Sequence, residues 1–372
     1  MDNNGNECST FYAKKEKQTK TATTNHRRIV SFHLNSRNPS HSFPFVLRLL
    51  LHMRTELQLL LVLFVASSLL ITVAMSFQTE CAASGKSCTV PGNTVTDSSV
   101  ELNSGHHIPV FALGVYQSEP GETTYKAVLQ ALRMGYRHID TAALYRNEED
   151  VGRAVRDSQI PREEIFVTTK LWNLSLKDGE DGYTFAKAEA AKSLEKLNIG
   201  YIDLYLIHSP HNPSERMEMW RAMEELVGEG TVRSIGVSNY GVHHIQEVLE
   251  QGTIPPAVNQ IELHPFLLRD EIAEFCAFNT IRVEAYSPLA KAQKFGHPVL
   301  LAMAKKYNKS EAQILIRWSL QRGYIALPKS VNPGRIKENA NVFNFGLNEK
   351  DMAALDGLDE HFTTGWDPTE MA

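Results

Sequence analysis

The stretch "GYRHIDTAALYRNEEDVG", from Gly135 to Gly152, predicts a strand that passes directly into a helix. Its apolar first part reads as a short strand, and "NEEDVGRAVRDS" reads as the start of a charged amphipathic helix with Asn147 as its N-cap. Asp140 and Tyr145 would then lie where the strand ends and the helix begins. This position indicates a functional role only if the rest of the chain also alternates strands with helices.

The same alternation continues from Val100 onward. After a predicted hairpin that turns near residues 103–105, eight apolar segments read as strands: "VFALGV", "HIDTA", "IFVTTK", "DLYLIH", "SIGVS", "AVNQIE", "VEAYS" and "IALPK". Amphipathic stretches such as "YKAVLQALRMGY" and "FAKAEAAKSLEKLN" separate them, which is typical of a parallel sheet covered by helices. Eight units in this length predict an α/β fold, a closed (β/α)8 TIM barrel over residues 98–372. The alternative, an open doubly wound sheet, would normally carry a G-x-G-x-x-G fingerprint, which is absent.

The first hundred residues have a different composition. Residues 1–56 are rich in Lys, Arg, Asn, Ser and Thr and are predicted to be disordered. Residues 57–77 contain the uncharged run "LLLVLFVASSLLITVAMSF", which predicts a signal peptide or signal anchor, and residues 78–97 read as a linker. Translation from Met53 would give an ordinary leader. We therefore expect a membrane-targeted or leader-bearing precursor, secretory or organellar, with a cytoplasmic protein as the alternative.

Composition narrows the classes of partner. The chain is 42% hydrophobic and 22% charged with a formal net charge of -5, so it can build a large core and has no basic excess for nucleic acid. Its four cysteines show no zinc-site spacing and are too few for a disulfide scaffold. We expect a monomer that contacts a membrane only through the N-terminal apolar segment.

In a barrel of this kind, functional side chains lie at the C-terminal ends of the strands. Those ends carry Asp140 and Tyr145, Lys170 and Trp172, His208, Ser238 and Asn239, Gln260 and Glu262, Tyr286, and Lys329 with Ser330. A buried ammonium and a buried carboxylate are each costly alone, so Lys170 and Asp140 are expected to pair. A lysine beside a phenol favours the phenolate, so we expect a lowered pKa for Tyr145, which suits a general acid.

The motifs "GYRHIDTAALYRNEEDVG", "VTTKLW", "YIDLYLIHSP", "IGVSNY", "VNQIELHPF", "EAYSPLA" and "LPKSVNPGRIKENANVFNF" together resemble the aldo-keto reductase family. The resemblance covers about residues 98–372 and implies hydride transfer from a nicotinamide to an aldehyde or ketone. It implies a catalytic tetrad of Asp140, Tyr145, Lys170 and His208, with Tyr145 as proton donor and His208 orienting the carbonyl. The short loop "AKAQKFGHP" is similar to that of microbial-like members.

The resemblance also implies how a cofactor and a substrate would be held. Ser238, Asn239 and Gln260 would bind the nicotinamide carboxamide, Tyr286 would stack on its ring, and Ser287 and Leu289 would also contact the cofactor. Tyr116 and Trp172 would form walls of the substrate pocket. Tyr116 stands where a tryptophan is common in the family, and Ser209 stands where some members carry an aromatic residue. We therefore do not infer the substrate of any particular member for this chain.

The segment "PKSVNPGRIKEN" predicts which cofactor is used. Lys329 offers a compact charge and Arg335 a planar fork for phosphate oxygens, while Ser330 and a helix start near Pro333 add donors. This cluster favours a cofactor with an extra ribose phosphate, NADP(H). The resemblance agrees, placing Lys329, Ser330 and Arg335 on the 2'-phosphate and Glu338 and Asn339 on the adenine.

Two other functions stay open on the sequence. A metal-dependent barrel hydrolase could use the side chains of His138, Asp140, His208, Glu262 and His264. A barrel of the same family could instead bind NADP(H) in a regulatory role with weak turnover. The resemblance implies a small-molecule carbonyl substrate. Selectivity would lie in the loops "NLSLKDGEDGYT" and "AKAQKFGHP" and in the tail "HFTTGWDPTEMA", whose sequences do not indicate which carbonyl compound is bound.

Overall fold

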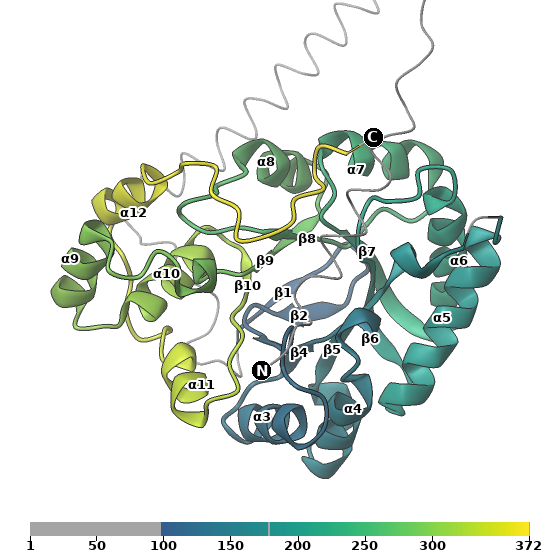
Figure 1. Cartoon of the computed structure of the whole chain (residues 1–372), viewed down its shortest axis with the longest axis horizontal. Coiled ribbons are helices and arrows are strands. Elements are labelled where there is room, and N and C mark those ends of the chain that lie inside the picture. The colour runs from purple at the N-terminus through teal and green to yellow at the C-terminus, as the bar shows by residue number, and fades with distance from the viewer. Residues whose placement is uncertain (1–97, 178, 372) are drawn as a thin grey trace, which may run out of the picture. The chain divides into compact units, whose positions relative to one another are not determined.

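The computed structural model of this chain describes residues 98–177 and 179–371, which belong to one compact unit. Eight strands form a single sheet in which each strand pairs in parallel with the next one along the chain (Figure 1). They are β3 (Leu113–Gly114), β4 (His138–Asp140), β5 (Phe166–Leu171), β6 (Ile202–Ile207), β7 (Val232–Ser238), β8 (Val258–Glu262), β9 (Arg282–Tyr286) and β10 (Ile325–Leu327). All eight predicted strands are confirmed.

The first and last strands of this sheet meet and close it. Phe111 bridges to Ala326 and Gly114 to Lys329, both in parallel register. The Ala326 amide donates to the Val110 carbonyl at 2.9 Å, and the Ala112 amide donates to the Ala326 carbonyl at 3.0 Å. A Cβ at Gly114 would lie 3.3 Å from the Leu327 carbonyl oxygen, so glycine permits this close approach. The expected (β/α)8 barrel is therefore the observed architecture.

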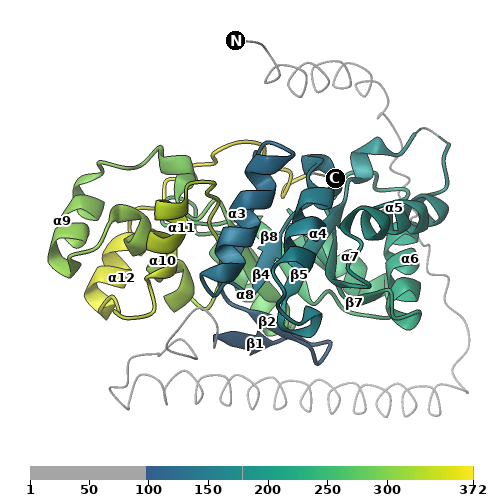
Figure 2. The ribbon, with the colours of Figure 1, turned by 90° about the horizontal axis from the view of Figure 1, so that it is seen from below.

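Helices surround the sheet, as Figures 1 and 2 show from two directions. One helix follows each of β3 to β8: α3 (Glu122–Arg133), α4 (Glu148–Asp157), α5 (Gly182–Leu197), α6 (Arg216–Gly228), α7 (Val242–Gln251) and α8 (Asp270–Phe278). Helix α10 (Glu311–Gln321) directly precedes β10, and α11 (Pro333–Ala340) follows it. Two more, α9 (Pro298–Tyr307) and α12 (Glu349–Asp356), lie outside the simple alternation. Short 3-10 turns such as η1 (Ala143–Tyr145) occupy the loops.

Alternation along the strands separates two apolar layers. Residues such as Ile139, Val167 and Ala285 belong to the large cluster that includes the helices. Their neighbours in sequence point the other way, and Phe166, Leu204, Leu206, Val258 and Ile325 form a smaller cluster inside the barrel. Polar side chains replace these apolar ones towards the C-terminal ends of the strands.

An antiparallel hairpin precedes the barrel, formed by β1 (Ser99–Glu101) and β2 (His107–Pro109), as predicted. Leu102 and Ile108 are buried and belong to the inner cluster together with Phe166, the first residue of β5. The hairpin therefore covers the N-terminal ends of the strands, at the lower edge of the coloured ribbon in Figure 2. A ligand must reach the barrel from the opposite end, where active sites of this fold lie.

The predicted N-terminal extension, residues 1–56, the apolar segment 57–77 and the linker 78–97 lie outside the described residues. Within residues 98–177 and 179–371, no helix has the length and apolar character needed to cross a membrane.

Candidate active site

Lys170 is the centre of a charged cluster at the C-terminal end of the barrel. Its Nζ donates to Asp140 Oδ1 at 2.8 Å, to Asp140 Oδ2 at 2.7 Å and to the Thr141 carbonyl oxygen at 2.8 Å. Both charged side chains are buried, so the predicted pair is confirmed. The Tyr145 hydroxyl lies 3.4 Å from the same nitrogen. The fold thus brings Asp140, Lys170 and Tyr145 together from β4, β5 and η1.

The expected lowering of the Tyr145 pKa is wrong for this structure. Burial raises the pKa of Tyr145 well above its usual value, and the Asp140 carboxylate adds to this effect. Asp140 contacts the ammonium through both oxygens, whereas the phenol is more distant, so Tyr145 lies beside a neutralised pair. Tyr145 consequently holds its proton as a neutral phenol.

Tyr145 belongs to a row of aromatic rings. The His208 ring lies 5.8 Å from the Tyr145 ring and 5.0 Å from that of Trp172, measured between centroids. Tyr116, which is 45% exposed, lies 5.0 Å from Tyr145. Burial and the nearby Lys170 ammonium hold the pKa of His208 well below its ordinary value, so its imidazole is neutral. These contacts place the rings of Tyr116, Tyr145, His208 and Trp172 side by side.

Ser238, Asn239, Gln260 and Tyr286 form one hydrogen-bonded network beside His208. The Tyr286 hydroxyl donates to Asn239 Oδ1 at 2.8 Å, and Asn239 Nδ2 donates to the His208 carbonyl oxygen at 2.9 Å. Ser238 Oγ donates to the Gln260 carbonyl oxygen at 2.9 Å. Asn239 and Ser287 have φ angles of 62° and 48°, in the left-handed region that is costly for such residues. Leu289 follows, half-buried.

A basic cluster lies just beyond β10. Lys329 is exposed and donates from Nζ to the Gln117 carbonyl oxygen at 3.1 Å, and Arg335 is in the first turn of α11. Asn332 Oδ1 caps this helix by accepting from the Arg335 amide at 3.1 Å. Although the residue as a whole is exposed, partial burial of its ammonium group lowers the pKa of Lys329, and the charge of Arg335 lowers it further. Two cations that disfavour each other beside a helix N-terminus suit an anionic ligand. Ser330 and Asn339 are buried next to this cluster, and Glu338 is exposed.

Residues 112–360 match the Aldo/keto reductase family. This chain belongs to that family. It is 43% identical over 272 residues to a glyoxal reductase of Bacillus subtilis (strain 168), spanning 73% of this chain and 96% of that protein. It is 40% identical over 275 residues to the methylglyoxal reductase DkgA of Escherichia coli (strain K12), spanning 73% and 97%.

The solved structure of a Bombyx mori aldo-keto reductase in complex with NADP superposes with a TM-score of 0.65 and 36% identity, covering 72% of this chain and 94% of that one. This aldo-keto reductase is therefore an oxidoreductase that acts on carbonyl compounds, and its family uses a nicotinamide cofactor.

Asn147 has a different role from the predicted one. Helix α4 does begin after Asn147, but the side chain does not cap the helix. Its Oδ1 accepts from Thr141 Oγ1 at 2.7 Å, and its Nδ2 donates to the Val115 carbonyl oxygen at 3.0 Å. The Asn147 side chain thus links the segment that follows β3 to the segment that follows β4.

Two buried polar residues near Lys170 and His208 are not among the predicted site residues. Asn173 exchanges hydrogen bonds with Ser209, donating from Nδ2 to the Ser209 carbonyl oxygen and accepting from Ser209 Oγ, both at 3.0 Å. Glu284, in β9, accepts from Gln260 Nε2 at 2.6 Å. Glu284 was interpreted only as part of a strand, although an acidic residue between apolar strand positions was a detectable signal.

The C-terminal tail, which is among the predicted selectivity loops, contacts the segments that follow β6 and β8. The Trp366 ring stacks on His211 with centroids 5.3 Å apart. Glu262 Oε1 accepts from the Thr364 amide at 2.9 Å, and Arg269 pairs with Asp367 at 2.6 Å. The tail is therefore fastened to β8 and to the loop that follows it.

The residues proposed for a metal centre do not converge. In the described part of the chain, no three His, Cys, Asp or Glu side chains form a group that could hold a metal ion. His138 contacts Thr168 Oγ1 at 2.9 Å inside the barrel, and His264 lies 3.3 Å from Glu262 near the tail.

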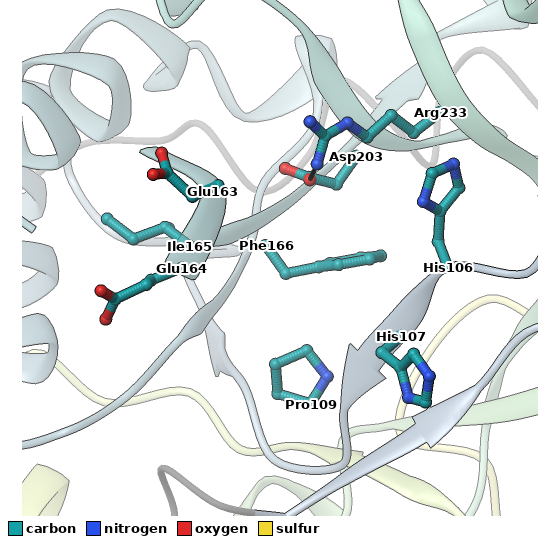
Figure 3. A pocket seen from close by; sticks show the side chains of 9 residues that line it. All are labelled: His106, His107, Pro109, Glu163, Glu164, Ile165, Phe166, Asp203 and Arg233. Atoms are coloured by element: carbon teal, nitrogen blue, oxygen red, sulfur yellow. Dashed lines mark ion pairs between the residues drawn. The ribbon is translucent and has the colours of Figure 1, made fainter. Parts of the chain in front are cut away.

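A separate pocket of about 210 Å³ opens at the N-terminal ends of the strands, lined by residues that include His106, His107, Glu163, Glu164, Asp203 and Arg233 (Figure 3). Asp203 is paired with Arg162 at 2.6 Å and with Arg233 at 3.6 Å, so its charge is already compensated. We assign this cluster to stability, which is the usual role of that end of the barrel.

Proposed function

We propose that this aldo-keto reductase reduces small aldehydes and ketones to alcohols with NADPH, and that Tyr145 donates the proton. The observation that carries the proposal is the neutral Tyr145 hydroxyl held 3.4 Å from the buried Lys170 ammonium at the open end of the barrel. A bound NADPH would supply the hydride. As the carbonyl oxygen gains electron density, Tyr145 passes its proton to that oxygen and Lys170 stabilises the phenolate that remains.

The other residues hold this donor and its acceptor in place. Asp140 fixes Lys170 through two hydrogen bonds, and neutral His208 can hydrogen-bond the carbonyl oxygen without competing for its proton. Ser238, Asn239 and Gln260 would bind the carboxamide, with Tyr286 beneath the ring and Ser287 and Leu289 further along the cofactor. Tyr116 and Trp172 would bound the substrate.

We propose NADP(H) rather than NAD(H) because of the cluster after β10. Lys329, Ser330 and Arg335 would hold the 2'-phosphate, and Glu338 and Asn339 would contact the adenine. The mutual repulsion of Lys329 and Arg335 would be relieved by a phosphate dianion, which favours the phosphorylated cofactor.

The substrates we propose are small α-dicarbonyl compounds. The names of two relatives, a glyoxal reductase and a methylglyoxal reductase, support this class. Tyr116, beside Tyr145, is 45% exposed, and a small substrate bound there would be oriented mainly by hydrogen bonds to Tyr145 and His208.

The test is Tyr145→Phe, assayed with NADPH and methylglyoxal. The change removes the hydroxyl and leaves the Asp140–Lys170 pair, so kcat should fall by about 100-fold or more while the Kd for NADPH stays near that of the wild type. Tyr183→Phe is the matched control, because it removes an exposed hydroxyl of α5 that bonds Glu225.

Retention of more than about a tenth of the wild-type kcat by Tyr145→Phe would show that Tyr145 is not the proton donor. A wild-type protein that binds NADPH tightly but turns over no aldehyde in the panel would favour the regulatory barrel instead.

A further inference from the structure

A buried acid lies directly beneath the proposed tetrad. Glu284 has 0% exposure and is paired in register with Gln260 of β8 and Ile325 of β10. The amide nitrogen of Gln260 donates to Glu284 Oε2 at 2.6 Å and to Asp140 Oδ2 at 2.8 Å. One amide group therefore joins two carboxylic side chains, one of which holds Lys170.

Among the described residues, the Lys170 ammonium lies near Glu284 but is already paired with Asp140. The three donors of Lys170 are directed to the two Asp140 oxygens and the Thr141 carbonyl. His138 Nε2 lies 3.6 Å from Glu284 Oε1, but burial lowers the pKa of His138 to about 3, so this imidazole is uncharged. An ionised Glu284 would be an uncompensated buried charge, which is strongly unfavourable. Burial and then the nearby Asp140 carboxylate raise the pKa of Glu284 to about 8.

We propose that Glu284 is a positioning residue for the reaction: it fixes the amide of Gln260, and Gln260 fixes Asp140 beneath Lys170 and Tyr145. The proposal rests on the function proposed above. Glu284 touches neither the substrate nor the proton that is transferred. It determines where Asp140 lies and how much negative charge lies below the phenol.

The protonation state of Glu284 then affects the acidity of Tyr145, the proposed proton donor. The titratable groups that face it are His138 and Asp140 from β4, Lys170 from β5 and Tyr145 from η1, whereas Gln260 and Ile325 on the flanking strands are uncharged. While Glu284 is neutral, one carboxylate faces one ammonium. Its ionisation adds a second negative charge, which raises the pKa of Tyr145 further and makes the phenol a weaker acid. Reduction should therefore slow as the pH rises through about 8.

The test compares Glu284→Gln, Glu284→Met and the control Glu148→Gln. Glutamine keeps an oxygen acceptor for Gln260 and cannot ionise, so kcat at pH 6.5 should stay within about 3-fold of the wild type while the decline near pH 8 disappears. Methionine offers no comparable acceptor, so kcat should fall by about 10- to 100-fold at every pH, with a smaller change in the NADPH Kd. Glu148 is a buried carboxylate on α4 that accepts from Thr169 at 2.7 Å, and its replacement should leave the pH profile unchanged.

A wild-type kcat in Glu284→Met, or an unchanged alkaline decline in Glu284→Gln, would overturn the proposal. Urea unfolding of the protein without cofactor gives a readout that does not depend on turnover. Because the folded-state pKa is raised, the wild type should lose stability relative to Glu284→Gln as the pH rises from about 4.5 to about 8, and parallel curves would also overturn it. If no variant, wild type included, reduced any aldehyde, the proposed function would fail, and the unfolding comparison would still decide whether Glu284 is held neutral.

Discussion

Lys170 shows what a single buried charge requires from the residues around it. Its ammonium is fully buried and finds three acceptors on β4 and the residue that follows β4, and this arrangement leaves it beside Tyr145 rather than bonded closely to it. The Asp140–Lys170 ion pair thus places an ammonium group next to the Tyr145 phenol. Its own contribution to the free energy of unfolding is small once the cost of desolvating both charges is included.

The basic cluster gives a prediction at the same scale. Lys329→Ala and Arg335→Ala each remove a charge-assisted contact of about 1.5 to 3 kcal/mol, so the Kd for NADPH should rise by about 10- to 100-fold while that for NADH barely changes. Lys337→Ala is the matched control, since Lys337 is an exposed lysine of the same helix α11. Cofactor titrations followed by fluorescence would measure these constants. Equal weakening of both cofactors would contradict the assignment of the phosphate site.

Individual residues were predictable from the sequence where chemistry demands a partner. Lys170 and Asp140 had to pair because neither could be buried alone, and the strand-end rule placed both at one end of the barrel. The pKa of Tyr145 was not predictable, since it depends on whether Lys170 is neutralised by a closer carboxylate. Glu284 was missed because its role comes from Gln260 on a neighbouring strand.

At the scale of elements, helix α4 illustrates how closely the outer layer packs. A Cβ at Gly152 would lie 2.6 Å from the carbonyl carbon of Leu197, the last residue of α5, and closer still to its oxygen, so the two groups would overlap. Arg156 Nη1 donates to the same carbonyl oxygen at 2.7 Å, so the two helices are fixed at this point. Residue 152 must be glycine because the Leu197 backbone lies so close to it, and not because of its own backbone angles.

Gly152→Ala should therefore lower the free energy of unfolding by about 2 kcal/mol or more, because the two helices must separate or the α5 end must shift. Gly228→Ala is the control: this residue ends α6 with no atom within 4 Å of an added Cβ, and the change should be neutral or stabilise by up to about 1 kcal/mol. Urea denaturation measures both. Similar stabilities for the two variants would show that the α4–α5 contact adjusts easily.

Helix α7 gives a prediction that depends on pH. His244 Nδ1 accepts from the Gly241 amide at 3.0 Å, and burial together with the adjacent His243 lowers the pKa of His244 to about 4. A lowered pKa means that the unfolded chain takes up the proton first, so this group costs stability as the pH falls from about 6.5 to about 4. His244→Gln keeps an acceptor and should flatten this loss, by up to about 1.4 kcal/mol per pH unit. Unfolding slopes identical to those of the wild type would contradict it.

The elements themselves were largely predictable. Eight apolar segments became eight strands because alternate residues of each one face two separate apolar layers, which fixes their register strongly. Asn147 shows the limit of local rules: its type and position are those of an N-cap, but Thr141 and Val115 approach from other loops and take its side chain. Helices α9 and α12 break the alternation, and no repeat in the sequence requires them.

At the scale of the whole molecule, the contacts that close the barrel join residues 110–114 to residues 326–329, within the described part of the chain. The hairpin that covers its lower end begins at β1, and the glyoxal reductase relative is matched over 96% of its length by 272 residues of this chain. We therefore predict that a chain of residues 91–372 folds with the same melting temperature and kcat as the complete protein. Differential scanning calorimetry and the methylglyoxal assay would check this. A large loss of either would show that residues before 91 stabilise the barrel.

The pairing of Phe111 with Ala326 has a consequence for how the protein is made. One edge of β3 has no neighbouring strand until β10 has left the ribosome. Phe111 and Ala326 are 215 positions apart in the sequence. At ordinary rates of translation this interval is roughly 10 to 40 s. During that time the nascent chain carries an open sheet edge and an uncovered apolar interior, so the growing protein is a natural client for chaperones that bind unpaired strands.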